Sequence, residues 1–428
     1  MLFQNIAVLQ SDFSVAQNLF VGVRGDKIAY IGAERPAERF GEEYDGRGKL
    51  LMSGFFNTHS HAAMTLLRGY AENLPLAQWL SEKVFPFEAR LDEQAVYWGS
   101  LLACAEMMRF GTVSFSDMYM FGDGMARAVL ESGLKANICV STVCFDGSSY
   151  FDLPSFHESV RLRERYHGAG EGRLLVDLCI HGEYTSTPKV VRELAGHAKE
   201  VCARIQLHLS ETKTEHEECK ARHGRTPAGY FLENGVFDVP VTAAHCVWVE
   251  DEDIAILARQ GVFAAANPAS NMKLASGFAP VPKLLEKGVC VTIGTDGAAS
   301  SNNLNMWKDL YLFSLIYKGY YQTPQLVSPA EALRCATVNG ALAQGREGCG
   351  SVAVGNRADL IAVDLDVPNM QPQTDMASNL CYAESGADVC LSMVDGRVLW
   401  QNGEYRTMDI EKIKFEAEAA TRNILKQL

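Results

Sequence analysis

The chain has 428 residues, and its 47% hydrophobic and 21% charged content is typical of a folded protein with a sizeable core, which excludes a disordered chain. The formal net charge of -13 repels phosphate backbones and anionic lipids, so we expect no nucleic acid polymer and no membrane surface as a partner. A neutral or zwitterionic small molecule fits this charge better.

The first part of the chain, residues 1–49, has the pattern of short strands separated by turns. Strand signals run over Asn5 to Gln10, Leu19 to Arg24 and Lys27 to Gly32. Because so few strands cannot close a core by themselves, we expect them to pair with strands from elsewhere in the chain.

From residue 50 the pattern changes to apolar strands that alternate with long helical stretches, such as Glu93 to Phe110, which indicates a parallel sheet. We predict eight strands: Leu50 to Thr58, Thr112 to Met118, Ala136 to Val143, Leu174 to Ile180, Arg204 to Leu209, Val241 to Ala244, Val262 to Ala266 and Val289 to Thr295. Eight parallel strands predict an α/β fold with a (β/α)8 TIM-like barrel over residues 50–349. A doubly wound open sheet is less favoured, because no G-x-G-x-x-G opens a helix.

Strand signals return near the C-terminus in three segments: Ala358 to Asp364, Val389 to Val394 and Arg397 to Trp400. The step Asp395-Gly396 between the last two is a hairpin turn signal. We therefore expect residues 1–49 and 350–428 to form one small β-sandwich. Its C-terminal part also carries an amphipathic helix over Asp409 to Leu428.

Active sites in such barrels lie at the C-terminal ends of the strands. Five of the ten histidines and one aspartate are predicted to lie there: His59, His61, His181, His208, His245 and Asp296. The pair His59 and His61 points both imidazoles to the same side of a strand, because side chains alternate with a period of two. A single histidine of this kind is more often structural, whereas a set sorted in this way predicts a functional site.

Four of these side chains form a ligand set of nitrogen and oxygen atoms: His59, His61, His208 and Asp296. Such a set suits one divalent catalytic metal ion per subunit, and zinc is expected, with iron, manganese and nickel as alternatives. A metal of this kind lowers the pKa of its bound water from about 16 toward about 7, which gives hydroxide at neutral pH.

Glu211 lies three residues beyond His208, in the loop that leaves the fifth strand, where a general acid and base is needed. His245 is either a fifth ligand or a group that holds the hydroxide and stabilises charge at the attacked centre. Asp296 is placed both to bind the metal and to accept the proton of the attacking water.

Several motifs resemble the amidohydrolase superfamily: Asn57-Thr58-His59-Ser60-His61, His208-Leu209-Ser210-Glu211-Thr212, Ala244-His245-Cys246 and Gly294-Thr295-Asp296-Gly297. Within it, Asn267 to Gly277 followed by Gly294 to Ser300 is similar to the 5-methylthioadenosine/S-adenosylhomocysteine deaminases. The resemblance covers nearly the whole chain, including Gly355 to Leu360.

The resemblance implies hydrolytic deamination of the adenine ring at C6 of adenosine-type nucleosides, with release of ammonia. It implies that Glu211 shuttles a proton to ring nitrogen N1, while His245 and Asp296 orient the hydroxide. Glu88 resembles the carboxylate that holds the ribose hydroxyls, and His181 a histidine that faces the purine. Trp79, which precedes Glu88 in a helical loop, either packs over the nucleoside or belongs to the core.

One departure from the family concerns S-adenosylhomocysteine. Members that accept this substrate use arginines near the third strand, but Cys139-Val140-Ser141-Thr142 contains none. Arg161, Arg163 and Arg165 lie in the next helical stretch, where surface charge is the expected role. This departure favours 5-methylthioadenosine, 5-deoxyadenosine or adenosine.

The sequence allows two alternatives to this function. One is a deaminase or hydrolase of another heterocycle on the same fold, of the guanine, 8-oxoguanine, pterin, cytosine or triazine type. The other is a catalytically silent binding scaffold, which the retained ligands and Glu211 disfavour. Other metalloenzyme designs are excluded, because no P-C-x-x-C follows His181-Gly182-Glu183 and no H-E-x-x-H occurs.

The sequence also indicates a cytoplasmic location. The twelve cysteines are scattered and include no C-x-x-C pair, as in a reduced protein with mostly buried thiols. Residues 1–11 lack the pattern of a signal peptide, and no stretch approaches the roughly 18 to 20 apolar residues of a membrane span. A homo-oligomer is a further possible assembly.

Overall fold

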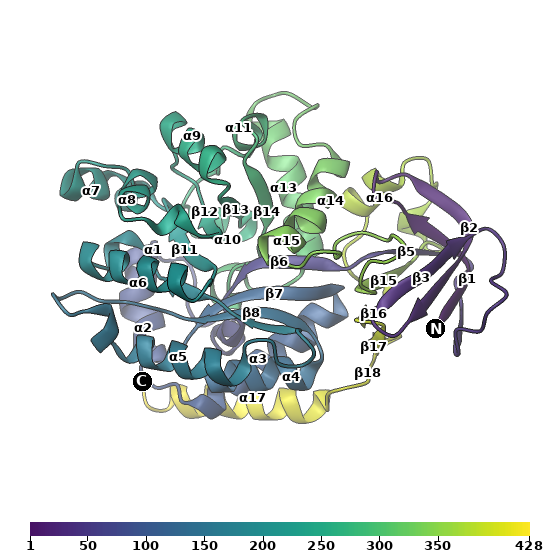
Figure 1. The fold of residues 1–428 in the computed structure, drawn as a ribbon, viewed down its shortest axis with the longest axis horizontal. Helices are drawn as coiled ribbons and strands as arrows, with labels where there is room; N and C mark the ends of the chain where they lie inside the picture. Colours follow the sequence, from purple (N-terminus) through teal and green to yellow (C-terminus); the bar gives the residue numbers. More distant parts are fainter.

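The computed structural model describes residues 1–76 and 78–428, and strands from both ends of the chain form one nine-stranded sheet in it, at the right of Figure 1. The sheet order is β18-β17-β16-β15-β5-β1-β2-β3, with β4 beside β1. The bounds of its strands are β1 Leu2–Leu9, β2 Val15–Arg24, β3 Lys27–Gly32, β4 Glu43–Asp45, β5 Lys49–Ser53, β15 Leu360–Asp364, β16 Val389–Val394, β17 Arg397–Gln401 and β18 Glu404–Tyr405. The two ends therefore pair as expected, and the division of this sheet into two facing layers stays a prediction.

The remaining strands form two parallel sheets, one of four strands and one of five. Their bounds are β6 Phe55–Ser60, β7 Thr112–Tyr119, β8 Lys135–Val140 and β9 Leu174–Val176 in the first, and β10 Leu178–Ile180, β11 Ile205–Leu209, β12 Val241–His245, β13 Phe263–Ala266 and β14 Cys290–Ile293 in the second. Only Asp177 separates β9 from β10. At the other edges, Thr58 Oγ1 lies 2.7 Å from Thr292 Oγ1 and donates to Ile293 O at 3.0 Å, which joins β6 to β14.

The predicted strand Leu50 to Thr58 is divided in the structure into β5 and β6. The first part pairs with β1 and β15 in the end sheet, whereas the second pairs with β7. Gly54 lies between them, and a Cβ atom there would come within 2.3 Å of Val113 Cγ1. The chain changes sheets at a position where only glycine fits. Residues 50–53, which were predicted to begin the barrel, therefore belong to the end sheet instead.

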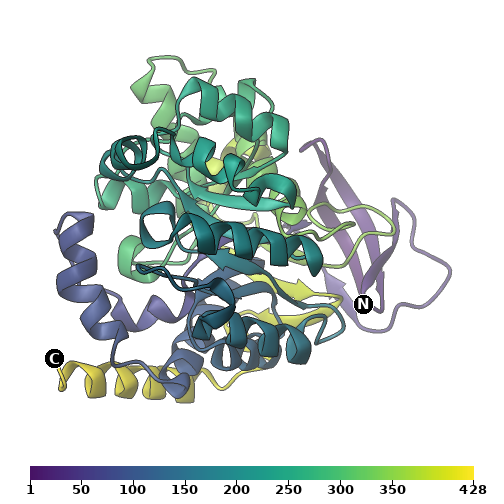
Figure 2. The same cartoon turned by 60° about the vertical axis from the view of Figure 1, so that its left-hand side comes forward.

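Helices follow most of the parallel strands and cover the sheets (Figures 1 and 2). They are α1 Leu76–Gln78, α2 Phe85–Glu88, α3 Glu93–Arg109, α4 Gly122–Ser132, α5 Pro154–Tyr166, α6 Pro188–Glu200, α7 Lys213–His223, α8 Pro227–Glu233, α9 Asp251–Gln260, α10 Pro268–Lys273, α11 Val281–Glu286, α12 Ala298–Ser301, α13 Met306–Tyr320, α14 Pro329–Ala336, α15 Val338–Ala343, α16 Met376–Tyr382 and α17 Ile410–Leu425. A π-helix, Trp79–Val84, joins α1 to α2. The predicted C-terminal helix is α17, which runs away from the end sheet and bonds through Thr421 Oγ1 to Leu66 O at 3.0 Å.

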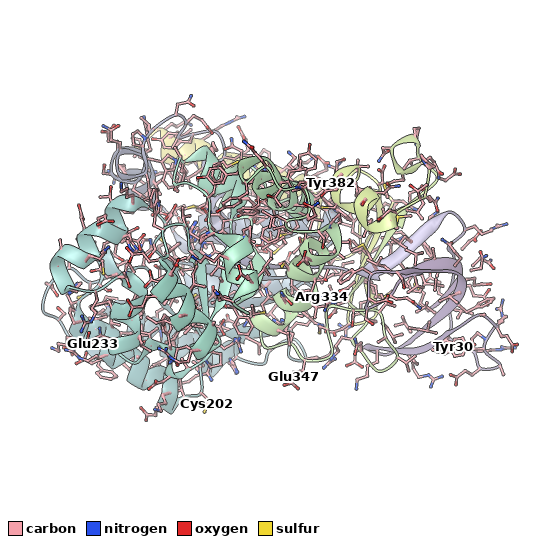
Figure 3. All side chains as sticks on the ribbon, turned by 90° about the horizontal axis from the view of Figure 1, so that it is seen from above. Tyr30, Cys202, Glu233, Arg334, Glu347 and Tyr382 are labelled. Atoms are coloured by element: carbon pink, nitrogen blue, oxygen red, sulfur yellow. The ribbon has the colours of Figure 1, made fainter. Side chains whose placement is uncertain are left out.

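The core consists of one large cluster that includes the parallel sheets, their helices and part of the end sheet, and a smaller cluster within the end sheet. A third, small cluster consists of Met118, Cys139 and Cys179. Figure 3 shows Tyr30 on the end sheet, with Cys202 and Glu233 at the opposite end of the molecule. The cysteines are free thiols, and most are buried, although Cys202 is exposed. Among the described residues, we find no helix that combines the length and the apolar character needed to cross a bilayer.

Candidate active site

The predicted metal ligands converge at the C-terminal ends of their strands. His59 lies near the end of β6, His208 lies near the end of β11, and Asp296 follows β14. Asp296 Oδ1 lies 3.5 Å from His59 Nε2 and 3.3 Å from His61 Nε2. His61 Nε2 lies 3.4 Å from His208 Nε2. His245, at the end of β12, offers a ring nitrogen within 4.8 Å of those of His59 and His208.

The imidazoles direct their lone pairs toward one point. The Nδ1 atoms of His61 and His208 lie 2.6 Å from the carbonyl oxygens of Met118 and His181. A carbonyl oxygen only accepts, so each Nδ1 carries a proton, and in the neutral ring Nε2 is then left with a lone pair. His59 Nε2 is buried without a hydrogen-bond partner, and burial lowers the pKa of His59 to about 4. Neutral nitrogen donors beside a carboxylate oxygen fit a divalent metal ion.

Asp296 is oriented by two serines that the sequence argument did not assign. Its Oδ2 accepts hydrogen bonds from Ser270 Oγ at 2.6 Å and Ser300 Oγ at 2.7 Å, which leaves Oδ1 facing the histidines. Burial alone would raise the pKa of Asp296, but the imidazole of His59, 3.5 Å away, and those of His61 and His245 hold it well below its usual range. Asp296 is therefore a carboxylate at neutral pH.

Glu211 and His245 lie side by side next to this cluster. Glu211 Oε2 is 3.8 Å from His245 Nε2, and Glu211 Oε1 is 3.5 Å from Ser276 Oγ. Burial raises the pKa of Glu211, so its carboxyl group holds a proton more readily than an exposed one. His245 Nδ1 lies 2.8 Å from Asn271 Oδ1, which fixes the ring. Asn271 belongs to the quoted Asn267 to Gly277 motif, but no role was predicted for it.

A cavity of about 390 Å³ is lined by most of these groups, namely His61, His208, Glu211, His245 and Asp296, and by all three predicted substrate contacts. His59 is not among its lining residues. Glu88 is half-buried at the end of α2, and burial raises the pKa of its carboxyl. His181 Nδ1 lies 3.0 Å from Thr185 Oγ1. Trp79 is buried, and its Nε1 donates to Ala71 O at 3.1 Å, so only the ring faces the cavity. A larger hollow of about 810 Å³, between α3, α17 and the end sheet, contains none of these residues.

The rest of the cavity wall is mainly apolar. Its apolar lining residues are Met64, Leu76, Leu80, Val84, Phe85, Met118, Met120, Val143, Phe145 and Leu274. Among the described residues that line it there is no lysine and no arginine. Phe145 is 77% exposed, which places an apolar side chain at the mouth. The acidic groups at the wall are Glu88, Glu211 and Asp296, so the cavity disfavours an anionic group on a ligand.

A family model and individual known proteins both resemble this chain. The model of the Amidohydrolase family matches residues 50–399. The chain is 43% identical over 426 residues to a 5-methylthioadenosine/S-adenosylhomocysteine deaminase of Dictyoglomus thermophilum, covering 100% of this chain and 99% of that protein. A protein of the same name from Thermoanaerobacter pseudethanolicus is 37% identical over 431 residues, covering 100% of both chains.

Solved structures resemble the whole chain. An adenosine deaminase from Xanthomonas campestris with bound zinc has a TM-score of 0.92 and 28% identity, covering 99% of this chain and 98% of that one. An atrazine chlorohydrolase from Arthrobacter aurescens, complexed with zinc, has a TM-score of 0.91 and 22% identity, covering 98% and 99%. The second likeness shows the fold alone.

Proposed function

The chain belongs to the amidohydrolase family, and from this premise we propose that it hydrolytically deaminates the adenine ring at C6 of an adenosine-type nucleoside, releasing ammonia. One observation carries the proposal: a single cavity is lined by His61, His208, His245 and Asp296, by the protonatable Glu211, and by Glu88. Such a combination suits hydrolysis of a C–N bond in a cyclic amidine next to a ribose.

The fold supports this proposal through the arrangement of the two parallel sheets. We propose that they form one (β/α)8 barrel, in which β9 and β10 together make the fourth strand and the bonds from Thr58 to Thr292 and Ile293 close the ring. The barrel then extends from Gly54 to about residue 349. Residues 1–53 and 350–428 form the β-sandwich and the C-terminal helix α17.

His59, His61, His208 and Asp296 are proposed to hold one divalent metal ion, with zinc as the expected occupant and Fe²⁺, Mn²⁺ or Ni²⁺ as alternatives. The orphaned Nε2 of His59 and the facing lone pairs of His61 and His208 support this assignment. When bound, such an ion supplies Lewis acidity that lowers the pKa of a water to about 7.

The acid and base roles fall to the chain's own carboxylates. Asp296, ionised at neutral pH, accepts the proton of the attacking water. Glu211, whose raised pKa allows it to carry a proton, donates that proton to ring nitrogen N1. The proton held by Asp296 passes to the C6 amino group, which leaves as ammonia, and the proton of the new C6 hydroxyl group returns to Glu211. His245 lies beside Glu211 and orients the attacking water.

The cavity wall supports a nucleoside with a small apolar 5' group. Glu88 accepts from the ribose hydroxyls, His181 faces the purine, and the Trp79 ring covers the nucleoside. A homocysteine carboxylate would meet no cation among the described lining residues. Arg163 donates to Val176 O and Val201 O, and Arg165 pairs with Asp123, so these arginines are used elsewhere. We therefore propose 5-methylthioadenosine, 5-deoxyadenosine or adenosine ahead of S-adenosylhomocysteine.

An ammonia-release screen tests this proposal. Adenine nucleosides that differ only at the 5' position are compared with guanine-type bases, using purified protein with measured metal content. Ammonia from methylthioadenosine supports the proposal. Ammonia from a free base such as guanine without turnover of any nucleoside would transfer the function to another heterocycle, and no ammonia from any of them would favour a binding scaffold.

A further inference from the structure

Glu215 holds the backbone of the residue proposed to move the proton. It lies in the first turn of α7, and its buried carboxylate turns back toward β11. Glu215 Oε1 accepts from the Ser210 N–H at 2.9 Å, and Oε2 accepts from the Glu211 N–H at 2.7 Å. One side chain thus fixes two successive backbone amides, and the second of them belongs to Glu211.

This contact differs from an ordinary helix cap. Thr212, the N-cap of α7, accepts from the Glu215 N–H at 3.1 Å, as a capping threonine does. In a capping box the carboxylate would bond back to the N-cap residue itself. Glu331 does so in α14, where it accepts from the Ser328 N–H at 2.9 Å. Glu215 instead reaches past Thr212 to the two residues before it.

The backbone at this point needs such support. Ser210 has a φ of 48°, in the left-handed region that non-glycine residues adopt at a cost. Its carbonyl oxygen accepts from the N–H groups of Val247 at 3.1 Å and Trp248 at 2.9 Å, in the loop after His245. The turn is therefore held from both sides, by Glu215 on one and by the His245 loop on the other.

The Glu211 side chain has weak contacts of its own, at 3.5 Å to Ser276 Oγ and 3.8 Å to His245 Nε2. Its direction therefore depends on its backbone. We propose that Glu215 is a positioning residue, whose two accepted hydrogen bonds hold the Ser210-Glu211 turn so that the Glu211 carboxyl faces the cavity. The inference rests on the proposed acid and base role of Glu211.

The test combines Glu215→Gln with Glu211→Gln, singly and together, in the full-length metal-loaded protein. Glutamine keeps the size of the side chain but replaces one acceptor with a donor that faces an N–H group. We expect Glu215→Gln to lower kcat at least about tenfold, with metal content unchanged, because a small misplacement of a reacting group is costly. In the Glu211→Gln background the same change should leave kcat unaltered, since residues that act as a unit are not additive.

Glu331→Gln is the matched control, because it removes a first-turn carboxylate acceptor from a helix outside the cavity. It should lower the melting temperature without changing kcat. An equal fold-loss from Glu215→Gln in both backgrounds, or no loss in either, would overturn the positioning role. If the wild-type protein releases ammonia from a base and from no nucleoside, the proposed substrate is wrong. The wild type, the two single variants at Glu211 and Glu215 and the double variant are then compared with that base as substrate.

Discussion

The Nε2 atoms of His61 and His208 lie 3.4 Å apart, and the Nδ1 of each ring faces a backbone carbonyl oxygen. In the neutral rings both Nε2 atoms therefore direct lone pairs at each other. At this separation they could form a hydrogen bond only if one of them carried a proton. In the neutral rings neither Nε2 carries that proton, because the Nδ1 of each ring donates to a carbonyl oxygen. A cation between them relieves this repulsion, so the site ties folding stability to metal binding.

Metal removal should lower both activity and stability. We expect a chelator to abolish ammonia release and to lower the melting temperature, because a ligand that binds only the folded state stabilises it. Metal analysis with scanning calorimetry checks this, and added zinc should restore both quantities. A chelated protein that is free of metal and melts at the original temperature would contradict the assignment.

Glu211→Gln should lower kcat by about 10²- to 10⁴-fold, the usual range for loss of a general acid and base. The carboxyl group lies beside the proposed ligands and is not one of them, so metal content should stay at the wild-type value. Kinetics and metal analysis on the same preparation check both parts. Full activity in the variant would refute the proton-transfer role.

Glu88→Gln should separate nucleosides from bases. A carboxylate that accepts from a ribose diol matters only when ribose is present, so turnover of methylthioadenosine should fall far more than turnover of free adenine. The comparison is made as kcat/KM for the two compounds. Equal losses on both would show that Glu88 has no ribose role.

Ser141→Arg should add acceptance of S-adenosylhomocysteine. Ser141 lines the cavity, which has no lysine or arginine among its described lining residues. A guanidinium there would meet the amino-acid carboxylate in a bidentate contact. We expect the ratio of kcat/KM for S-adenosylhomocysteine to that for methylthioadenosine to rise. Ser141→Leu adds bulk without charge and should leave that ratio unchanged or lower it.

Asp309 should make stability depend on pH. Burial raises its pKa to about 8, and its Oδ2 has no hydrogen-bond partner. The folded protein therefore keeps this proton while the unfolded chain loses it from about pH 4 upward, so the free energy of unfolding falls between about pH 4 and 8. Asp309→Asn should flatten this slope and be relatively more stable at pH 8. Urea midpoints at pH 5 and 8 measure the difference, and equal slopes would contradict the prediction.

Much of the candidate site could be predicted because metal ligands have distinctive residue types at strand ends. His59, His61, His208, His245 and Asp296 are recognisable in this way, and the structure brings them together. The groups that orient them are not recognisable. Ser270, Ser300 and Glu215 act through hydrogen bonds set by loop geometry, and serine or glutamate at such positions is common on any surface.

The sequence predicted where the strands lie better than it predicted which sheet each strand joins. The segment from Leu50 to Thr58 is apolar throughout, so periodicity gives no sign that it serves two sheets. The signal that divides it is Gly54, and its meaning depends on the close approach of Val113, which follows far later in the chain. A contact between distant segments is not encoded in the local pattern.

The position of β5 in the end sheet has a consequence for the nascent chain. On one side β5 pairs with β1, which is made before it, but on the other it pairs with β15, with Lys49 opposite Asp364. During synthesis the second edge stays open until most of the polypeptide has left the ribosome. An open strand edge is a template for pairing with other chains, so we expect newly made molecules to be most prone to aggregation before β15 arrives.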